Sequence, residues 1–302
     1  MKQVEFHLFG DSSLPAMRLG ESALWDARLK KFYWVDIDGR RVYRSSADGQ
    51  LVEYRECDGR PGCVALTANE ELLLVALEQT VMTLHWPSAT FSTFARVGGK
   101  TKHVRLNDGK TDRFGLFWVG SMHSPSSEGR RDGELVRINS SGTVQNLKQD
   151  VGVANGLAFT PDGKWGFFAD SPTRQVLRFE LRDGAPDLST ERVFFDFQTA
   201  GLEGKPDGAC IDAEGCYWVA CGYGASVARI DPKGRLDRLI PVPVGRPTCC
   251  VFGGPNLDQL LVTSIGAANA PQHSGSSEDA WAGRVITADL GIQGTPEGVF
   301  AL

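Results

Sequence analysis

Three oxygen-bearing side chains stand in apolar surroundings. Glu21 lies within RLGESALW, Asn155 within VANGLA and Asp207 within PDGACI. A carboxylate flanked by apolar residues is unfavourable unless it meets water, a cation or a hydrogen-bond donor. Two carboxylates and one amide oxygen suit a single divalent cation, with Ca²⁺, Mg²⁺ or Mn²⁺ favoured and Zn²⁺ or Fe²⁺ as alternatives. Taken one at a time, Asn-Gly and Asp-Gly are also ordinary turn formers.

A further polar cluster is RLNDG at 105–109. Arg105 and Asn107 point to the same face of an extended segment, since alternate side chains share a face. They could hold a polyhydroxylated or anionic ligand, or form an ion pair and a capped turn. His103 and His123 lie close to this cluster in sequence, as supporting residues or, more simply, as surface histidines. The chain has no serine elbow, P-loop or dinucleotide-binding turn, which disfavours serine catalysis and nucleotide cofactors.

Residues so far apart in sequence can meet only if the fold brings them to a common axis. Short runs of aromatic and β-branched residues recur every 41 to 50 residues, which is the size of a propeller blade. The runs are FYWVDI at 32–37, LLLVAL at 72–77, LFWVGS at 116–121, GFFADS at 166–171, YWVACG at 217–222 and LLVTSI at 260–265. Turn residues precede each run. The spacing predicts an all-β, six-bladed β-propeller with a central metal-binding channel.

The same repeat predicts how the ring is organised and closed. We expect a single domain over residues 1–302, closed by pairing of a strand within 4–9 with one within 283–290. Segment 266–283 is polar and rich in small residues, which predicts a flexible surface loop that could act as a lid. We interpret Asp212–Ala220 as a blade turn followed by an inner strand. Four aspartates are predicted to serve blade turns: Asp108, Asp112, Asp162 and Asp212.

Composition limits the possible partners. Hydrophobic residues make up 41% and charged residues 23%, as in ordinary soluble globular proteins. The net charge of -5 argues against nucleic acid or an anionic membrane as the partner. No apolar run approaches the roughly 20 residues of a membrane span, and no signal peptide is evident. The seven cysteines form no C-x-x-C pair, so buried thiols in a reducing cytoplasm are favoured over a zinc site. We expect a cytoplasmic monomer or small homo-oligomer.

Five segments resemble the gluconolactonase/regucalcin (senescence marker protein) family, in the same order and over nearly the whole chain. They are LGESALWD at 19–26, RLNDGKTDRFGLFWVGSM at 105–122, NGLAFTPDGKWGFFADS at 155–171, PDGACIDAEGCYWVA at 206–220 and FGGPNLDQLLVTS at 252–264. The resemblance implies a six-bladed propeller that binds one divalent metal and hydrolyses sugar lactones. Carried over by motif, Glu21, Asn155 and Asp207 would be metal ligands. Arg105 and Asn107 would contact the substrate.

We therefore expect metal-dependent hydrolysis of an aldonolactone to the open aldonic acid, in carbohydrate catabolism. The metal would act as a Lewis acid, and Asp207 could serve as the base that guides water. Three alternatives stay open: an aryl-ester or organophosphate hydrolase, a lactonase for a sulfonated or phosphorylated sugar lactone, and a non-catalytic metal-binding propeller. One departure from the family lies in the first motif, where Ser22-Ala23 replaces the usual Gly-Pro.

Overall fold

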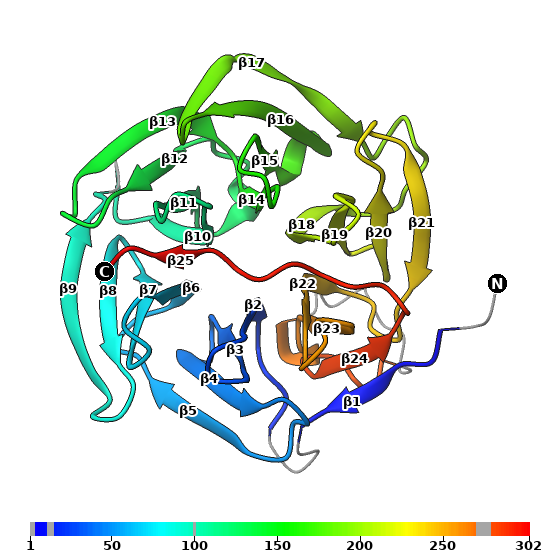
Figure 1. Cartoon of the computed structure of the whole chain (residues 1–302), viewed down its shortest axis with the longest axis horizontal. Coiled ribbons are helices and arrows are strands. Elements are labelled where there is room, and N and C mark those ends of the chain that lie inside the picture. Colours follow the sequence, from blue (N-terminus) through cyan, green and yellow to red (C-terminus); the bar gives the residue numbers. More distant parts are fainter. Residues whose placement is uncertain (1–3, 11–14, 99–100, 270–278) are drawn as a thin grey trace.

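Six antiparallel sheets form a ring in the computed structural model, which describes residues 4–10, 15–98, 101–269 and 279–302 (Figure 1). Five sheets have four strands and one has five. The helices among the described residues are three single 3-10 turns, η1 (Ser126–Glu128), η2 (Ser171–Thr173) and η3 (Ala267–Asn269). None of them has the length and apolar character needed to cross a membrane. The predicted all-β, six-bladed propeller is confirmed.

The strands of each blade run in sequence order from the axis outward, with two exceptions: the last strand of the chain is added on the inner side of blade 2, and the first strand of the chain is outermost in blade 6. Blade 1 is β2 (Gly20–Asp26), β3 (Lys31–Asp36), β4 (Arg41–Ser46) and β5 (Val52–Glu56). Blade 2 is β6 (Pro61–Thr67), β7 (Leu72–Leu77), β8 (Thr80–His85) and β9 (Thr90–Arg96), with β25 (Val299–Phe300) on the inner side. Blade 3 is β10 (Val104–Thr111), β11 (Phe117–His123), β12 (Gly133–Ile138) and β13 (Val144–Val151). Blade 4 is β14 (Ala154–Phe159), β15 (Trp165–Asp170), β16 (Gln175–Arg182) and β17 (Ala185–Asp196). Blade 5 is β18 (Lys205–Ile211), β19 (Tyr217–Gly222), β20 (Ser226–Ile230) and β21 (Leu236–Pro241). Blade 6 is β22 (Pro247–Gly253), β23 (Gln259–Ser264), β24 (Val285–Asp289) and β1 (His7–Phe9).

The six recurring apolar runs are the second strands of the blades, β3, β7, β11, β15, β19 and β23. The interpretation of 217–220 as part of an inner strand is wrong, because β18 lies between β19 and the axis. Second strands are covered on both faces by the neighbouring blades, so they are the most apolar and are the easiest to find in the sequence. Trp118 and Trp218, both fully buried, illustrate this position.

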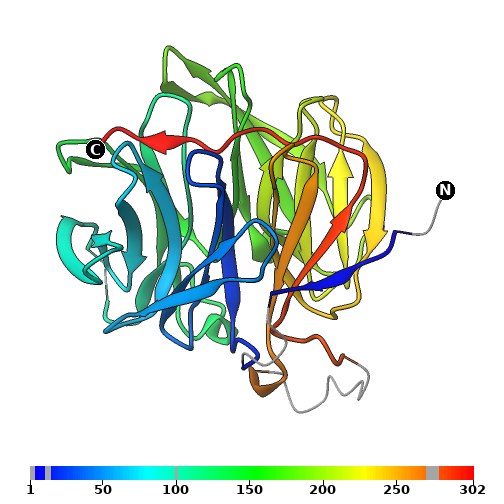
Figure 2. The same cartoon turned by 60° about the horizontal axis from the view of Figure 1, so that its bottom comes forward.

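The ring is closed by segments from both ends of the chain. β1 pairs antiparallel with β24, with His7 opposite Thr287 and Phe9 opposite Val285. β25 pairs parallel with β6 after the chain has crossed one end of the ring (Figures 1 and 2). Together these pairings link blade 6 to the first and second blades in sequence. The predicted lid at 266–283 lies partly outside the described residues, because 270–278 are not among them.

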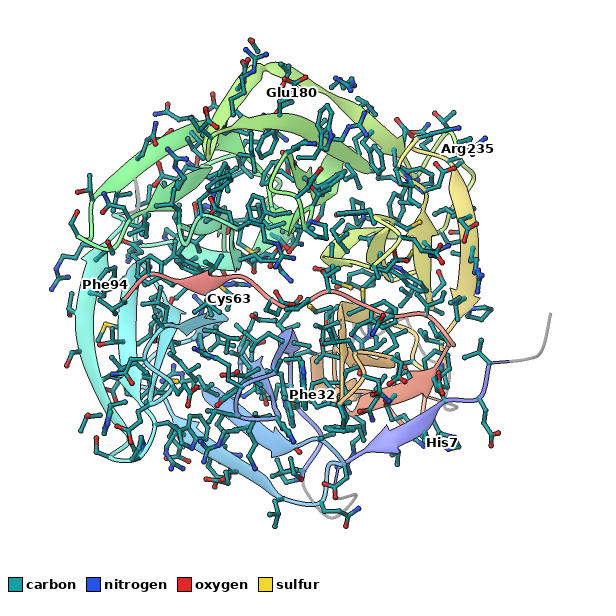
Figure 3. The ribbon with its side chains drawn as sticks, in the orientation of Figure 1. His7, Phe32, Cys63, Phe94, Glu180 and Arg235 are labelled. Carbon is teal, nitrogen blue, oxygen red and sulfur yellow. The ribbon has the colours of Figure 1, made fainter. Side chains whose placement is uncertain are left out.

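Blade faces pack on each other through buried aromatic residues, while polar side chains lie on the outer rim. Between blades 4 and 5, Phe167 and Tyr217 have ring centroids 5.0 Å apart. Figure 3 shows Cys63 close to the axis, with Glu180 and Arg235 at the periphery. Each large apolar side chain buried in this way stabilises the fold by roughly 1.5 to 3 kcal/mol. The chain is therefore held as a rigid frame around its innermost strands.

Candidate active site

The six innermost strands share one irregularity, a β-bulge in their first half. In β2, for example, Glu21 lies opposite Val35 but Leu24 lies opposite Tyr33, so β2 holds one extra residue. The innermost strand of every other blade also has one extra residue at the equivalent point. A bulge twists the strand and redirects side chains. Here it lets consecutive residues of one strand face the axis.

Two of these bulges contain residues with positive φ. Gly156 in β14 has φ of 66°, and a Cβ there would lie 2.6 Å from the Tyr217 hydroxyl, so glycine is required. Ser22 in β2 has φ of 52°, at the position where the first motif departs from Gly-Pro. The Ser22 hydroxyl accepts a hydrogen bond from the Val64 backbone N–H at 3.0 Å. This bond to blade 2 offsets part of the strain of a left-handed serine.

The bulges bring Glu21 of blade 1 and Asp207 of blade 5 within hydrogen-bonding reach of each other. Glu21 is only 9% exposed. Burial, followed by the charges of Asp207 and Asp108, raises the pKa of Glu21 well above its usual value. Burial and the Asp108 carboxylate also raise the pKa of Asp207, to about 7, against the opposing effect of Lys205. Two carboxylates in contact at a buried position repel each other unless a proton or a cation lies between them.

Asn155 lies on β14 in blade 4, next to blade 5, and its amide is part of a line of hydrogen bonds. Asn107 Nδ2 donates to Asn155 Oδ1 at 3.1 Å and to the Ala154 carbonyl at 2.9 Å. Arg105 Nη1 donates to Asn107 Oδ1 at 2.7 Å and to the Leu106 carbonyl at 2.9 Å. The structure thus brings Arg105, Asn107 and Asn155 into one bonded cluster, as their proximity to a common axis predicts.

Arg105 is a buried cation with neutral partners. It is 6% exposed, and burial followed by the nearby Arg60 charge lowers the pKa of its guanidinium to about 10. Within the described residues, only Nη1 of its guanidinium has a hydrogen-bond partner, and both acceptors are uncharged. Its remaining N–H groups can therefore donate to a bound molecule.

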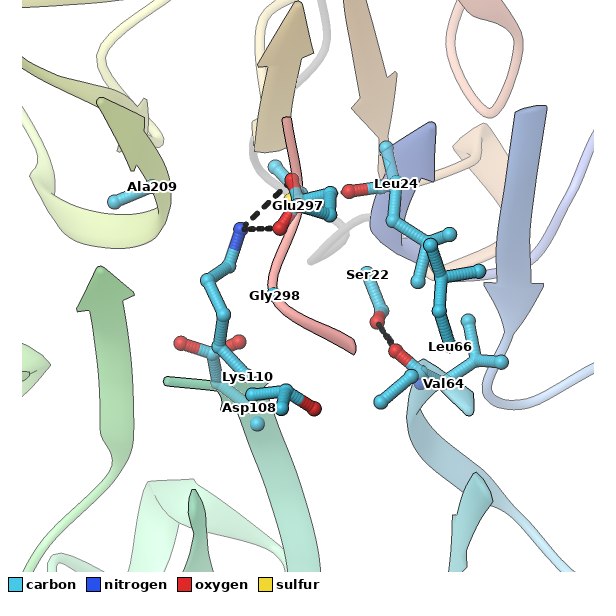
Figure 4. A pocket seen from close by; sticks show the side chains of 14 residues that line it. Ser22, Leu24, Val64, Leu66, Asp108, Lys110, Ala209, Glu297 and Gly298 are labelled. Carbon is cyan, nitrogen blue, oxygen red and sulfur yellow. Dashed lines mark hydrogen bonds and ion pairs between the residues drawn. The ribbon is translucent and has the colours of Figure 1, made fainter. Parts of the chain in front are cut away.

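Asp108 was predicted to serve a blade turn, and this prediction is wrong. It lies within β10, next to the bulge, and Figure 4 shows it lining a cavity. Asp108 Oδ2 accepts a hydrogen bond of 3.0 Å from the Leu157 N–H in blade 4. Burial raises the pKa of Asp108, and this bond opposes the shift. The other three aspartates, Asp112, Asp162 and Asp212, do lie in turns. Each accepts hydrogen bonds from the backbone N–H groups of residues that follow it in the sequence.

The cavity below Asp108 is closed by the C-terminal segment. It has a volume of about 20 Å³, enough for one water molecule, and its lining includes Ser22, Asp108 and Cys249. Lys110 and Glu297 form an ion pair of 3.2 Å across it (Figure 4). Glu297 belongs to the segment that crosses the ring at the far ends of the innermost strands. Glu21, Asn155 and Asp207 lie near the opposite ends of their strands, so any substrate must approach from the end that this segment leaves uncovered.

The histidines and cysteines have other roles. His103 is exposed, but His123 is 3% exposed, so the prediction of a surface residue is wrong for His123. Its ring nitrogens lie 3.1 Å from Asp132 and 2.9 Å from Glu128. All seven cysteines are buried and free, and none is part of a disulfide. Across the described part of the chain, no three His, Cys, Asp or Glu side chains group in a way that could hold a metal.

A cation at this site would therefore need the Asn155 amide oxygen as well as the two carboxylates. The donor set fits such an ion, because all three groups offer oxygen atoms and the two carboxylates are in contact with each other. Sequence reasoning missed two members of the neighbourhood. Asp108 was assigned to a turn. Ser171 forms a hydrogen bond of 2.8 Å with Asn155, but the only sequence signal for it is its position at the end of segment 155–171.

Comparisons with known proteins show the family of the chain. Residues 19–266 match the model of the SMP-30/gluconolactonase/LRE-like region. The chain is 32% identical to 6-deoxy-6-sulfogluconolactonase of Pseudomonas putida, over 94% of this chain and 95% of that protein. It is 31% identical to L-arabinolactonase of Azospirillum brasilense, over 98% of both. It superposes on the calcium-binding protein regucalcin of Agrobacterium tumefaciens with a TM-score of 0.86 and 25% identity, over 95% of each chain. The chain belongs to the SMP-30/gluconolactonase/LRE-like family.

Proposed function

We propose that this protein hydrolyses a sugar lactone to the open aldonic acid, with one divalent cation held by Glu21, Asn155 and Asp207. The proposal rests on the contact between the Glu21 and Asp207 carboxylates, at the end of the ring where Asn155 is hydrogen-bonded to Asn107 and Asn107 to Arg105. Two curated relatives are named as sugar lactonases, which supports the reaction class. A structural neighbour is described as calcium-binding, which supports a divalent cation. The all-oxygen set favours Ca²⁺, Mg²⁺ or Mn²⁺ over Zn²⁺ or Fe²⁺.

Each residue has a task that follows from its surroundings. A cation bound here would polarise the lactone carbonyl and make a nearby water more acidic. Asp207 is the carboxylate that we assign to take the proton of the attacking water, because as a cation ligand it would lie beside the water that the cation holds. Water adds to the carbonyl carbon, the ring C–O bond breaks, and the ring oxygen receives a proton. Arg105 and Asn107 hold the substrate's hydroxyl groups and so fix its orientation.

The test is a pH-drop assay, because opening a lactone releases an acid. Purified protein is supplied with γ- and δ-aldonolactones, aryl esters and an organophosphate, before and after chelation and after return of Ca²⁺, Mn²⁺ or Zn²⁺. We expect acid release from aldonolactones that stops on chelation and recovers with the cation. Asp207→Ala and Asn155→Ala should abolish this activity in folded protein. Full activity of either variant after metal removal would refute the proposal, and cation binding without acid release would indicate a non-catalytic propeller.

A substrate with an anionic substituent is a second candidate. The buried Arg105 guanidinium has only neutral partners, and Arg60 lies close enough to affect its pKa. Lys205 lies two residues before Asp207, and its charge lowers the pKa of Asp207. Arg60 already pairs with Glu78 at 3.1 Å, so the candidate rests on Arg105, whose hydrogen bonds go to neutral groups and leave its other N–H groups for an anionic group on the ligand. A sulfonated or phosphorylated lactone should then show a higher kcat/KM than its neutral analogue, and added salt should reduce this preference.

A further inference from the structure

Ser171 connects two blades at the candidate site. It follows β15 as the first residue of η2 and is 1% exposed. Asn155 Nδ2 donates to Ser171 Oγ at 2.8 Å. The Ser171 hydroxyl donates in turn to the Pro206 carbonyl at 2.7 Å, on the residue before Asp207. One hydroxyl therefore contacts a proposed cation ligand in blade 4 and the backbone beside another in blade 5.

Ser171 is the last side chain of a hydrogen-bond line whose direction cannot be reversed. The line starts at the Arg105 guanidinium and runs through the amides of Asn107 and Asn155 to Ser171, and it ends at the Pro206 carbonyl. A guanidinium has no acceptor and a backbone carbonyl has no donor. Both ends therefore impose the same direction, and neither amide can rotate by 180° without losing bonds at both its oxygen and its nitrogen.

This direction matters because a cation binds the oxygen of an amide and not its nitrogen. The two ends of an asparagine side chain are nearly equal in size, so hydrogen-bond partners decide which way it points. Ser171 accepts from the nitrogen of Asn155 and so keeps the oxygen on the side of Asn107 and the site. Resting on the proposed cation site, we infer that Ser171 is a positioning residue that orients Asn155 for cation binding, although it does not touch the ion.

Loss of the hydroxyl should weaken cation binding. In Ser171→Ala the buried Asn155 nitrogen loses its acceptor, so only the bond from Asn107 still holds the amide in this direction. Removal of a group that orients a metal ligand typically lowers metal affinity by about 10- to 100-fold. Ser171→Thr retains a hydroxyl on the same carbon and should keep the affinity within about threefold of the wild type.

Ser121→Ala is the matched control. Ser121 is also buried, at 2% exposed, on the second strand of the neighbouring blade 3. Its hydroxyl likewise takes part in two hydrogen bonds, accepting from the Glu134 N–H at 2.9 Å and donating to the Glu134 carbonyl at 3.4 Å. These bonds run outward to β12, away from the line that includes Asn155. Its loss should lower the temperature of thermal unfolding without changing cation affinity.

The experiment is calorimetric titration of Ca²⁺ and Mn²⁺ into metal-stripped, full-length wild type, Ser171→Ala, Ser171→Thr and Ser121→Ala, with thermal unfolding as a check on folding. The inference predicts a 10- to 100-fold rise in Kd for Ser171→Ala alone. An unchanged Kd in Ser171→Ala, an equal loss in Ser171→Thr, or an equal loss in Ser121→Ala would each overturn it. If the wild type binds the ions and opens lactones while Ser171→Ala titrates normally, only this inference fails. A wild type that opens lactones without binding either ion would overturn the cation site and the role of Ser171 together.

Discussion

Replacing Asp207 with asparagine should stabilise the metal-free protein while it abolishes the response to cations. Asp207 is in contact with the buried Glu21, and Asp108 adds a third carboxylate nearby. Without a cation, desolvation and the Asp108 carboxylate make the ionised form of Asp207 unfavourable, which destabilises the folded state. Asparagine has almost the same shape as aspartate and removes one charge from the group.

The magnitude follows from the pKa of Asp207, which is about 7 in the folded protein. An aspartate in an unfolded chain has a pKa of about 3.9, and each unit of difference corresponds to about 1.36 kcal/mol. The three units between them correspond to about 4 kcal/mol of destabilisation above pH 7. Because Asp207 is partly exposed to solvent, we expect Asp207→Asn to recover about 2 to 4 kcal/mol.

The sign of the pH dependence is fixed by the raised pKa. Between about pH 4 and pH 7 the folded protein holds a proton on Asp207 that the unfolded chain has already lost. The contribution of Asp207 to the stability of the metal-free wild type should therefore fall as the pH rises through this window and become level above it. The advantage of Asp207→Asn should be 2 to 4 kcal/mol at pH 8 and shrink to about 1 kcal/mol at pH 5.

Urea unfolding of the metal-stripped proteins at pH 8 and pH 5 would measure these differences. Asp112→Asn is the control, because Asp112 is also buried but accepts bonds from the Phe114, Leu116 and Trp118 N–H groups. That variant should be less stable than the wild type at pH 8, by about 1 to 3 kcal/mol. Added Ca²⁺ or Mn²⁺ should stabilise the wild type and leave Asp207→Asn unchanged. A metal-free Asp207→Asn protein less stable than the wild type at pH 8 would refute the argument.

Two other substitutions test separate parts of the ring. Arg105→Lys should lower kcat/KM for lactones by about 10- to 100-fold, because an ammonium cannot hold Asn107 Oδ1 and the Leu106 carbonyl while it also reaches a substrate. Initial rates over a range of lactone concentrations would measure kcat/KM, and an unchanged value would contradict the prediction. Lys110→Met leaves Glu297 largely buried without its partner and should lower the free energy of unfolding by about 3 to 5 kcal/mol. Its kcat should match the wild type, since the pair lies at the far end of the ring, and a stability equal to the wild type would show that the pair contributes nothing.

The fold could be predicted from the sequence because its signals are local. Second strands such as β19 are buried on both faces, so they appear as apolar runs bounded by turn residues. Their spacing of 41 to 50 residues is enough to predict six blades. The innermost strands are more polar and carry glycines, as in β18, and the sequence alone did not distinguish them from turns.

The candidate site was only partly predictable, and the reason is the bulge. In a regular strand Asn107 and Asp108 would point to opposite faces. The extra residue in β10 instead lets Asn107 bond to Asn155 while Asp108 bonds to Leu157, both across the gap to blade 4. Alternation along the sequence therefore gives the wrong direction for Asp108.

The position of Ser171 illustrates a second limit. Its residue type and its place beside a second strand resemble those of Ser264, whose hydroxyl instead donates to the Arg284 carbonyl, within blade 6. What distinguishes Ser171 is the neighbouring blade, which places the Pro206 carbonyl within 2.7 Å. Whether a side chain can orient a ligand depends on both of its hydrogen-bond partners, and the two partners of Ser171 belong to different innermost strands, β14 and β18. Such a residue can be recognised only after the register of adjacent blades is known. The role of Asp207 depends on the arrangement of the blades in the same way. An Asp-Gly pair is common in turns, and Asp207 becomes a candidate base only because β18 brings it into contact with Glu21 of β2.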